Sequence, residues 1–281
     1  MSHLGTRLYP PDSLLFTTRR LPFGLYMKTC IRSQQNEAMA LLLIEKHTSV
    51  PAPLYIDDYK DGENTVLIST RIPGQTLENI FHRLSHAERE QLSQDLKEAI
   101  HQLRRIPNRS QYRFANTLGL ALYDNRTGLF GPFRTLAEFN RHFIAEYGNA
   151  EFMRKFASIH SRPHRPFFSH ADLCPSNIIT SQGRLAGIVD WESAGFYPEY
   201  WEYIRGIEAT NNLKTVLVNE DRNMVVGMEK ILRDAFDEDY EDELRGEIIR
   251  KLRPSLVERI GAIARQYGAY SGLNVGGDDQ S

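Results

Sequence analysis

The chain has 281 residues, and its 34 lysine and arginine residues against 36 aspartate and glutamate residues leave a formal net charge of −2. This near-neutral balance gives no electrostatic reason to expect nucleic acid or an anionic membrane as a partner, and the apolar runs are too short to cross a bilayer. The 41% hydrophobic content and two cysteines without a CxxC pair fit a packed protein in a reducing compartment, so we expect a cytoplasmic protein without an export signal.

The first part of the chain, up to residue 72, is predicted to be mainly sheet with one helix. Short apolar and β-branched runs indicate strands, and a run of strong helix formers indicates the helix. An Asp61-Gly62 turn joins the last two strands. The predicted strands are Leu14–Thr18, Gly24–Ile31, Pro53–Asp57 and Thr65–Thr70, and the predicted helix is Gln35–His47.

After residue 72 the pattern becomes mainly helical. Arg71–Gly74 breaks the last strand and is predicted to be a hinge. A capping-box pattern at Ser85 opens an amphipathic helix to about Ile106. The other predicted elements are a helix over Thr135–Tyr147, a hairpin over Asn177–Trp191 that turns at Gly183, and helices over Tyr200–Ile207 and Asn223–Tyr267.

The predicted plan is therefore an α+β protein of two lobes. A small N-terminal lobe spans residues 1–72, a larger and mainly helical lobe spans 73–271, and 272–281 form a flexible tail. The sequence does not indicate an oligomeric state.

The run SHADLCPSN, residues 169–177, concentrates polar groups between apolar, strand-like ends. Asp172 and Asn177 lie on this loop, and Asp190 follows on the far strand of the predicted hairpin, which should bring it back beside Asn177. Carboxylate and amide oxygens are suited to a magnesium ion that carries a polyphosphate. In this arrangement Asp172 would face the reacting hydroxyl group.

The order His170, Asp172, Leu173, Asn177 matches the catalytic-loop pattern of kinases, with alanine in place of arginine. Asp190-Trp-Glu follows where a protein kinase has Asp-Phe-Gly. From about Phe16 to Tyr203 the chain resembles the aminoglycoside phosphotransferase and choline kinase-like family, whose loop reads His-Gly-Asp-x-x-x-x-Asn. The resemblance implies a bilobal, protein-kinase-like fold and a small-molecule kinase that uses ATP and Mg²⁺.

The family's roles can be carried over to matching positions. The resemblance implies that Asp172 orients the substrate hydroxyl and accepts its proton, that Asn177 and Asp190 hold Mg²⁺, and that His170 braces the catalytic loop. It further implies that Lys28 binds the α- and β-phosphates with Glu37 as its partner. The adenine ring would lie against the hinge. The residues implied there are Ser69, Arg71 and Ile72.

One departure from the family keeps a second interpretation open. Only Gly5 and Gly24 precede Lys28, so no GxGxxG loop covers the phosphates. The leading hypothesis is transfer of the γ-phosphate of ATP to a hydroxyl of a small molecule, and the alternative is a non-catalytic nucleotide-binding module. A protein kinase is a third hypothesis, disfavoured because Asp190 and Pro198 stand too close for a long activation segment.

Three other features are predicted to be structural. His160 and His164 have a metal-like spacing without a cysteine or carboxylate companion nearby, so zinc is not expected. The acidic run Asp237–Glu243 is interpreted as a solvated helix face, with a patch for a cationic substrate as the alternative. The aromatic residues Trp191, Tyr200 and Trp201 are expected in the core.

Overall fold

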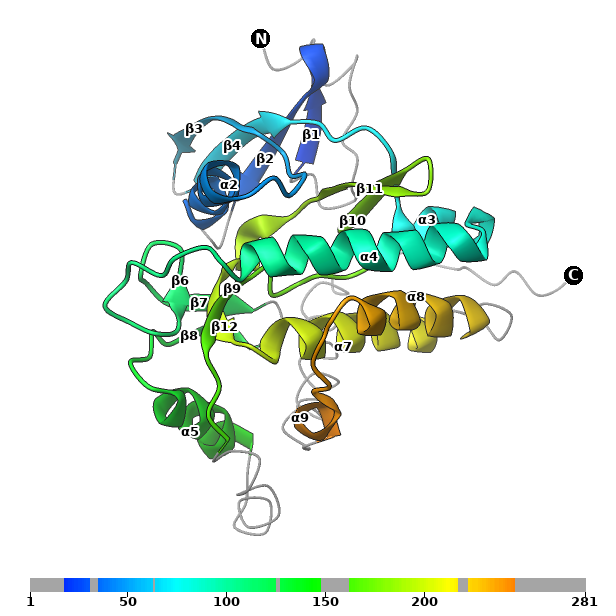
Figure 1. Cartoon of the computed structure of the whole chain (residues 1–281). Coiled ribbons are helices and arrows are strands. Elements are labelled where there is room, and N and C mark those ends of the chain that lie inside the picture. Colours follow the sequence, from blue (N-terminus) through cyan, green and yellow to red (C-terminus); the bar gives the residue numbers. More distant parts are fainter. Residues whose placement is uncertain are drawn as a thin grey trace, which may run out of the picture.

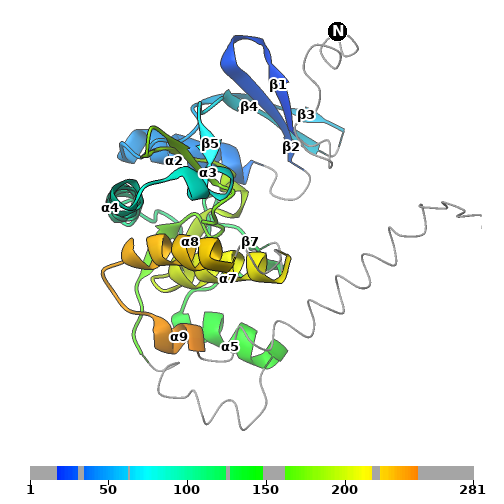
Figure 2. The same cartoon turned by 90° about the vertical axis from the view of Figure 1, so that its right-hand side faces the viewer.

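A computed structural model describes residues 18–30, 35–62, 64–124, 127–147, 162–216 and 222–245. A small sheet with one helix lies above a larger, mainly helical part (Figure 1), which confirms the predicted α+β, two-lobed fold. In both views α5 and α9 lie at the end of the molecule opposite the N-terminal sheet (Figure 2).

The N-terminal sheet has four antiparallel strands in the order β1-β2-β4-β3. Helix α2 turns Ala40, Leu41 and Ile44 into the core, so the predicted helix is confirmed. Of the first predicted strand only Thr18 lies within the described residues, where it begins β1. The bounds are β1 Thr18–Leu21, η1 Pro22–Gly24, β2 Leu25–Cys30, α2 Asn36–His47, β3 Tyr55–Asp61 and β4 Asn64–Thr70.

The connection between the two parts lies directly on the hairpin that follows the polar loop. Residues 71–73 have no regular structure, as the predicted break requires, and Gln75 and Thr76 pair with β10. Gly74 has φ 142°, and a Cβ there would lie 2.5 Å from the carbonyl oxygen of Thr180. Only glycine allows this approach. The elements that follow are β5 Gln75–Thr76, α3 Leu77–Ile80 and η2 Phe81–Arg83.

Helices form most of the larger lobe. The capping box predicted at Ser85 is present, with Glu88 as its partner, and the helix it opens buries Leu92, Leu96 and Leu103. Helices α4, α7 and α8 run side by side beneath the hairpin (Figure 1). The bounds are α4 His86–Leu103, α5 Leu136–Tyr147, α7 Trp201–Val216, α8 Arg222–Asp234 and α9 Glu241–Arg245.

The helix predicted over Asn223–Tyr267 is wrong as a single element. Residues 235–240 separate α8 from α9, and the segment after residue 245, with the predicted tail, lies outside the described residues. Most of the acidic run is exposed, as a solvated face requires, but it is not one helix face, because residues 237–240 precede α9. Several of its carboxylates pair with basic groups across the lobe. The pairs of Asp237 join the α8–α9 connection to α4, and Glu238 pairs with Arg104 directly after α4. The pairs join Asp237 to Lys97 and His101, Glu238 to Arg104, and Glu243 to Arg162.

Short strands frame the polar loop. Strand β12 pairs with β9 on one side and β6 on the other, and β10 and β11 form the predicted hairpin with Gln182 and Gly183 at positive φ in its turn. Strands of two to four residues carry too little alternation to be read from sequence. The bounds are β6 Ala115–Asn116, β7 Leu122–Asp124, β8 Gly128–Phe130, β9 Pro166–Ser169, β10 Ile178–Ser181, β11 Arg184–Ile188, η3 Trp191–Ser193 and β12 Gly195–Pro198.

The aromatic residues lie in the core, as expected. Trp191 is fully buried, and Tyr200 and Trp201 are 7% exposed. Trp191 stacks on Phe168 and meets the ring of His170 edge-on at 4.5 Å, so aromatic packing supports the polar loop from behind. Among the described helices, none combines the length and the apolar composition that crossing a bilayer requires.

Candidate active site

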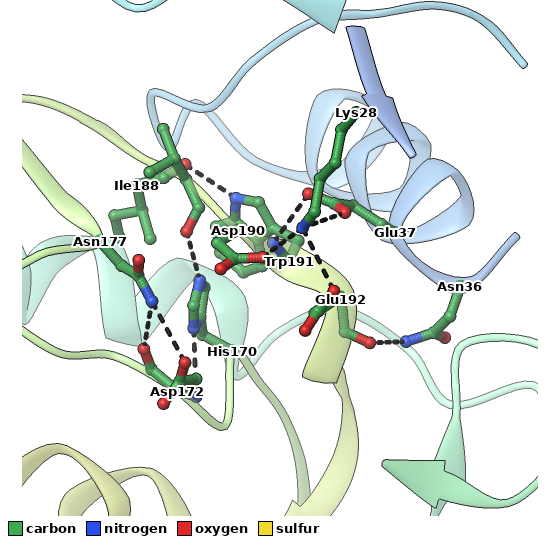
Figure 3. Close-up of polar contacts among 11 residues, drawn as sticks. Lys28, Asn36, Glu37, His170, Asp172, Asn177, Ile188, Asp190, Trp191 and Glu192 are labelled. Carbon is green, nitrogen blue, oxygen red and sulfur yellow. Dashed lines mark hydrogen bonds and ion pairs between the residues drawn. The ribbon is translucent and has the colours of Figure 1, made fainter. Parts of the chain in front are cut away.

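The hairpin brings the two predicted motifs together. Ile178 pairs with Ile188 across β10 and β11, and the N–H of Val189 donates to the carbonyl oxygen of Asn177 at 3.0 Å. The loop before β10 and the residues after β11 therefore leave the hairpin at the same end. Figure 3 shows the resulting site, with His170, Asp172 and Asn177 on one side and Lys28, Glu37 and Asp190 on the other.

His170 ties the loop to the hairpin. Its Nε2–H donates to the carbonyl oxygen of Val189 at 2.8 Å, and its Nδ1 accepts the backbone N–H of Asp172 at 3.2 Å. The ring is completely buried, and this burial, outweighing the favourable carbonyl contact and the charge of Asp190, lowers its pKa to about 4. The imidazole is therefore neutral near pH 7, in the form that both hydrogen bonds require.

Asp172 and Asn177 are bound to each other across the loop. The Nδ2 of Asn177 donates to the main-chain oxygen of Asp172 at 2.9 Å and reaches its carboxylate Oδ2 at 3.4 Å. With the amide nitrogen committed to Asp172, the amide oxygen of Asn177 is the atom that a metal ion would use.

Glu202, on α7, anchors the loop from below. Its carboxylate accepts the backbone N–H groups of His170 and Ala171, the latter at 3.1 and 3.2 Å from its two oxygens. Ala171 has φ 64°, a left-handed conformation that a residue with a Cβ adopts rarely. Burial raises the pKa of Glu202 from an ordinary 4.5 to about 7, although the backbone donors oppose the rise.

Lys28 is the centre of the other half. Its Nζ lies 2.7 Å from Glu37 and 3.4 Å from Glu192, and it also contacts Asp190. Burial alone would lower the pKa of Lys28, but the surrounding carboxylates raise it well above its ordinary value. Burial likewise favours a higher pKa for Asp190, but the ammonium of Lys28 outweighs it and lowers that pKa.

Acidic groups outnumber the lysine here, which suits a divalent cation. The carboxylate oxygens of Glu37, Asp190 and Glu192 all lie within 4.8 Å of one another. Asp190 has φ 67°, which turns its side chain toward Lys28 immediately before the chain enters η3. Of the two predicted metal ligands, Asp190 belongs to this group, and Asn177 lies at the same end of the hairpin, where its carbonyl oxygen accepts the N–H of Val189. The oxygen donors fit Mg²⁺ in type.

The predicted hinge residues lie away from this polar network. Ser69 is on β4 and pairs with Tyr26, and the N–H of Arg71 donates to the carbonyl oxygen of Gly24 at 2.7 Å. Ile72 packs so closely on β11 that a Cβ at Gly187 would lie 2.9 Å from its side chain. Their predicted contact with adenine stays a prediction.

Three residues of the site were missed by the sequence analysis. Glu192 adds a carboxylate beside Lys28, Glu202 anchors the loop, and Asn36 joins α2 to the segment after Asp190. Glu192 and Glu202 both lie between Asp190 and Tyr203, within the stretch that resembles the family, which was the available signal. Nothing in the local sequence distinguishes Asn36.

His164 has a structural setting. Its Nδ1 lies 3.0 Å from Glu199 and its Nε2 lies 3.6 Å from Glu243, and the ring of Tyr200 packs edge-on against it at 4.8 Å. His160 lies outside the described residues, so the spacing of the two histidines is not tested. The sequence next to His164 contains no carboxylate. Glu199 and Glu243 lie beside it because the tertiary fold brings them there.

Comparison with known proteins gives a family match. The model of a family described as "Phosphotransferase enzyme family" matches residues 31–213. No curated protein sequence matches the chain.

Several solved structures share the fold. Aminoglycoside phosphotransferase APH(4)-Ia has a TM-score of 0.58 at 17% identity, over 92% of this chain and 90% of that one. Aminoglycoside phosphotransferase APH(3'')-Id from Streptomyces rimosus, in complex with ADP and streptomycin, scores 0.52 at 14% identity, over 88% and 91%. The apoenzyme of macrolide 2'-phosphotransferase MphH from Brachybacterium faecium scores 0.52 at 12% identity, over 96% and 93%.

Proposed function

Because the chain belongs to the phosphotransferase enzyme family, we propose that it transfers the γ-phosphate of ATP, with Mg²⁺, to a hydroxyl group of a small molecule. The observation that carries the proposal is the convergence of Asp172, Asn177 and Asp190 on one hairpin end, with Lys28 reaching Asp190 from the N-terminal sheet. The lobes are proposed to divide at residues 72 and 73.

The nucleotide side of the reaction falls to Lys28 and its neighbours. Lys28 would exchange its contact with Asp190 for the α- and β-phosphates, while Glu37 keeps the ammonium in place. Asp190 and Asn177 would hold Mg²⁺, which neutralises charge on the phosphates. Adenine would lie along Ser69, Arg71 and Ile72.

The acceptor side falls to the loop. Asp172 would orient the hydroxyl group and take its proton, because its carboxylate is held in place by Asn177. His170 holds the backbone of Asp172 through Nδ1 and, being neutral and buried, is assigned a positioning role in this proposal.

A small acceptor is favoured over a protein. After Asp190 the chain enters η3 and then β12, which is paired on both sides by β9 and β6. A segment built into a sheet in this way is not available to seat a peptide. Streptomycin in the related structure is a small acceptor of the same kind.

The experiment is a coupled assay of ADP release with Mg-ATP and a panel of aminoglycosides, macrolides, amino alcohols and sugars, together with mass spectrometry of the products. Acceptor-dependent ADP release with a product heavier by one phosphate is the expected result. Binding of Mg-ADP with no turnover on any acceptor would support the alternative, a non-catalytic nucleotide-binding module. Phosphate transfer to casein but to no small acceptor would support a protein kinase.

A further inference from the structure

Asn36 is the first residue of α2 and directly precedes Glu37, but its side chain leaves its own helix. An asparagine at the N-cap ordinarily accepts a backbone N–H of its helix, but Gln35 occupies that position here. The amide nitrogen of Asn36 donates to the carbonyl oxygens of Glu192 at 2.9 Å and Ala194 at 2.8 Å. Both acceptors lie in the segment immediately after Asp190.

The amide oxygen of Asn36 also accepts two hydrogen bonds. It accepts the backbone N–H of Thr117 at 3.0 Å and the Thr117 hydroxyl at 2.6 Å. Asn36 is only 2% exposed, so water does not compete for these bonds. Both donors and both lone pairs of the amide are therefore used within the protein.

These bonds join three separate parts of the chain. Asn36 belongs to the N-terminal lobe, and Thr117 follows β6, the strand that pairs with β12. A second bond runs between the same elements, because the N–H of Trp191 donates to Oε1 of Glu37 at 3.2 Å. Helix α2 is thus attached to main-chain groups of Trp191, Glu192 and Ala194, all in the segment after Asp190.

We propose that Asn36 is a positioning residue that holds α2 against the loop after Asp190, so that Glu37 and Lys28 are aligned before a nucleotide arrives. The expected consequence of this positioning is tighter binding of Mg-nucleotide, and this part of the inference rests on the proposed function. Because Asn36 bonds to carbonyl oxygens, its hold does not depend on the charge of Glu192. The nucleotide half of the site is therefore preassembled and needs no separate step that docks α2.

Thr117→Val tests this inference without touching α2 or the catalytic groups. It removes the hydroxyl bond to Asn36 and keeps the backbone bond, while Thr117→Ser restores the hydroxyl. Thr210→Val is the matched control, since it removes a fully buried hydroxyl that donates to Gly206 within α7. Asn36→Asp is a second, stronger variant, because it replaces the amide nitrogen and its two N–H donors with one carboxylate oxygen that faces the two carbonyl groups.

Isothermal titration with Mg-ADP and hydrogen exchange of the α2 amides are the readouts. Thr117→Val should weaken Mg-ADP about fivefold, the size expected for one buried hydrogen bond, and should speed exchange at the start of α2. Asn36→Asp should do both more strongly. Thr117→Ser should match the wild type, and Thr210→Val should change neither quantity even if it lowers the unfolding temperature.

In turnover assays the KM for ATP should rise while the KM for the acceptor stays unchanged. Wild-type Mg-ADP affinity and wild-type α2 exchange in folded Thr117→Val and Asn36→Asp would overturn the inference. Failure of the proposed function would give a different result, namely absence of turnover by the wild-type protein. Hydrogen exchange of the α2 amides would still test whether Asn36 holds α2 in place.

Discussion

The two halves of the site are held by different forces. The half around Lys28 is an ion cluster assembled from β2, α2 and the residues after β11. The half around Asp172 is a loop held by hydrogen bonds, several of them to backbone groups. Charge attraction tolerates small displacements, whereas hydrogen bonds demand direction. The ammonium of Lys28 can therefore change partners while α2 stays in place through Asn36, and the acceptor half keeps one geometry.

The largest expected effect is on turnover in the hydrogen-bonded half. Asp172→Asn should lower kcat by roughly 10²- to 10⁴-fold, the usual contribution of a general base, because the amide cannot take a proton. Mg-ADP affinity should stay within about twofold, since the proposed role of Asp172 is on the acceptor hydroxyl and not on the nucleotide. Asp61→Asn, on the exposed edge of β3, is the control. Equal loss of nucleotide binding and turnover would contradict the separation of the halves.

In the ion cluster, the largest effect should be on stability. Lys28→Met leaves Glu37 buried without its ammonium, and breaking a buried pair costs about 3 kcal/mol. The loss should shrink as pH falls toward 4.5, because the pKa of Glu37 is raised by burial and the carboxyl group then becomes protonated. Urea unfolding at pH 7.5 and pH 5 measures both effects.

Two companion variants sharpen this test. Lys28→Met combined with Glu37→Gln should recover part of the lost stability, because the buried charge is removed with its partner. Lys46→Met, at an exposed position of the same helix, should change stability by less than about 0.5 kcal/mol. A loss that is the same at both pH values would show that Lys28 acts through packing instead of charge.

Glu202 should make the free energy of unfolding fall as pH rises. A salt-bridged acid, whose pKa is lowered in the folded protein, has the opposite effect. The pKa of Glu202 is about 7 in the folded protein and near 4.5 when unfolded. The folded state therefore binds a proton that the unfolded chain has released. The stability from this group is complete below pH 4.5 and is lost as pH rises through 7.

Glu202→Gln should remove that slope, which corresponds to at most about 3 kcal/mol between pH 4.5 and 8. Unfolding by urea across this range measures it, with the exposed Glu45→Gln as control. The variant keeps one carbonyl oxygen as acceptor for the N–H groups of His170 and Ala171, so it should still fold. An unaltered slope would mean that Glu202 is ionised in the folded protein throughout.

The smallest effect should come from Ala171→Gly. Relief of the left-handed conformation is worth 1 to 2 kcal/mol by rough estimate, and the greater freedom of glycine in the unfolded chain cancels part of it. We expect a net gain of about 0.5 kcal/mol in unfolding free energy. Ala52→Gly, where φ is not positive, should destabilise. A destabilised Ala171→Gly would show that the methyl group is needed in the loop.

Much of the site could be predicted because its chemistry lies in short, ordered motifs. The loop from His170 to Asn177 and the hairpin that returns to Asp190 depend on local turn signals and on neighbouring strands. The strand carrying Lys28 and the helix carrying Glu37 were likewise visible in local patterns. What local patterns could not provide was Asn36, whose partners lie 81 and 156 to 158 positions away.

The acidic run Asp237–Glu243 is a second feature whose contacts could not be predicted from local sequence. Its composition is that of a solvated helix, yet its carboxylates pair with basic residues of α4 and with Arg162. Ion pairs between distant segments depend on how the helices pack, and the composition of either segment alone does not contain that information.

The amino-acid order by itself carried the resemblance to the family, through the motifs around Asp172 and Asp190. It also determined the two-lobed plan and the hairpin that joins the two motifs, because these follow from periodicity, turn residues and spacing. The tertiary structure alone decided that Lys28 meets three carboxylates, that Glu202 is buried beneath Ala171, and that Asn36 spans the lobes. Burial and hydrogen-bond direction are properties of positions in space, and they arise only when distant segments pack together.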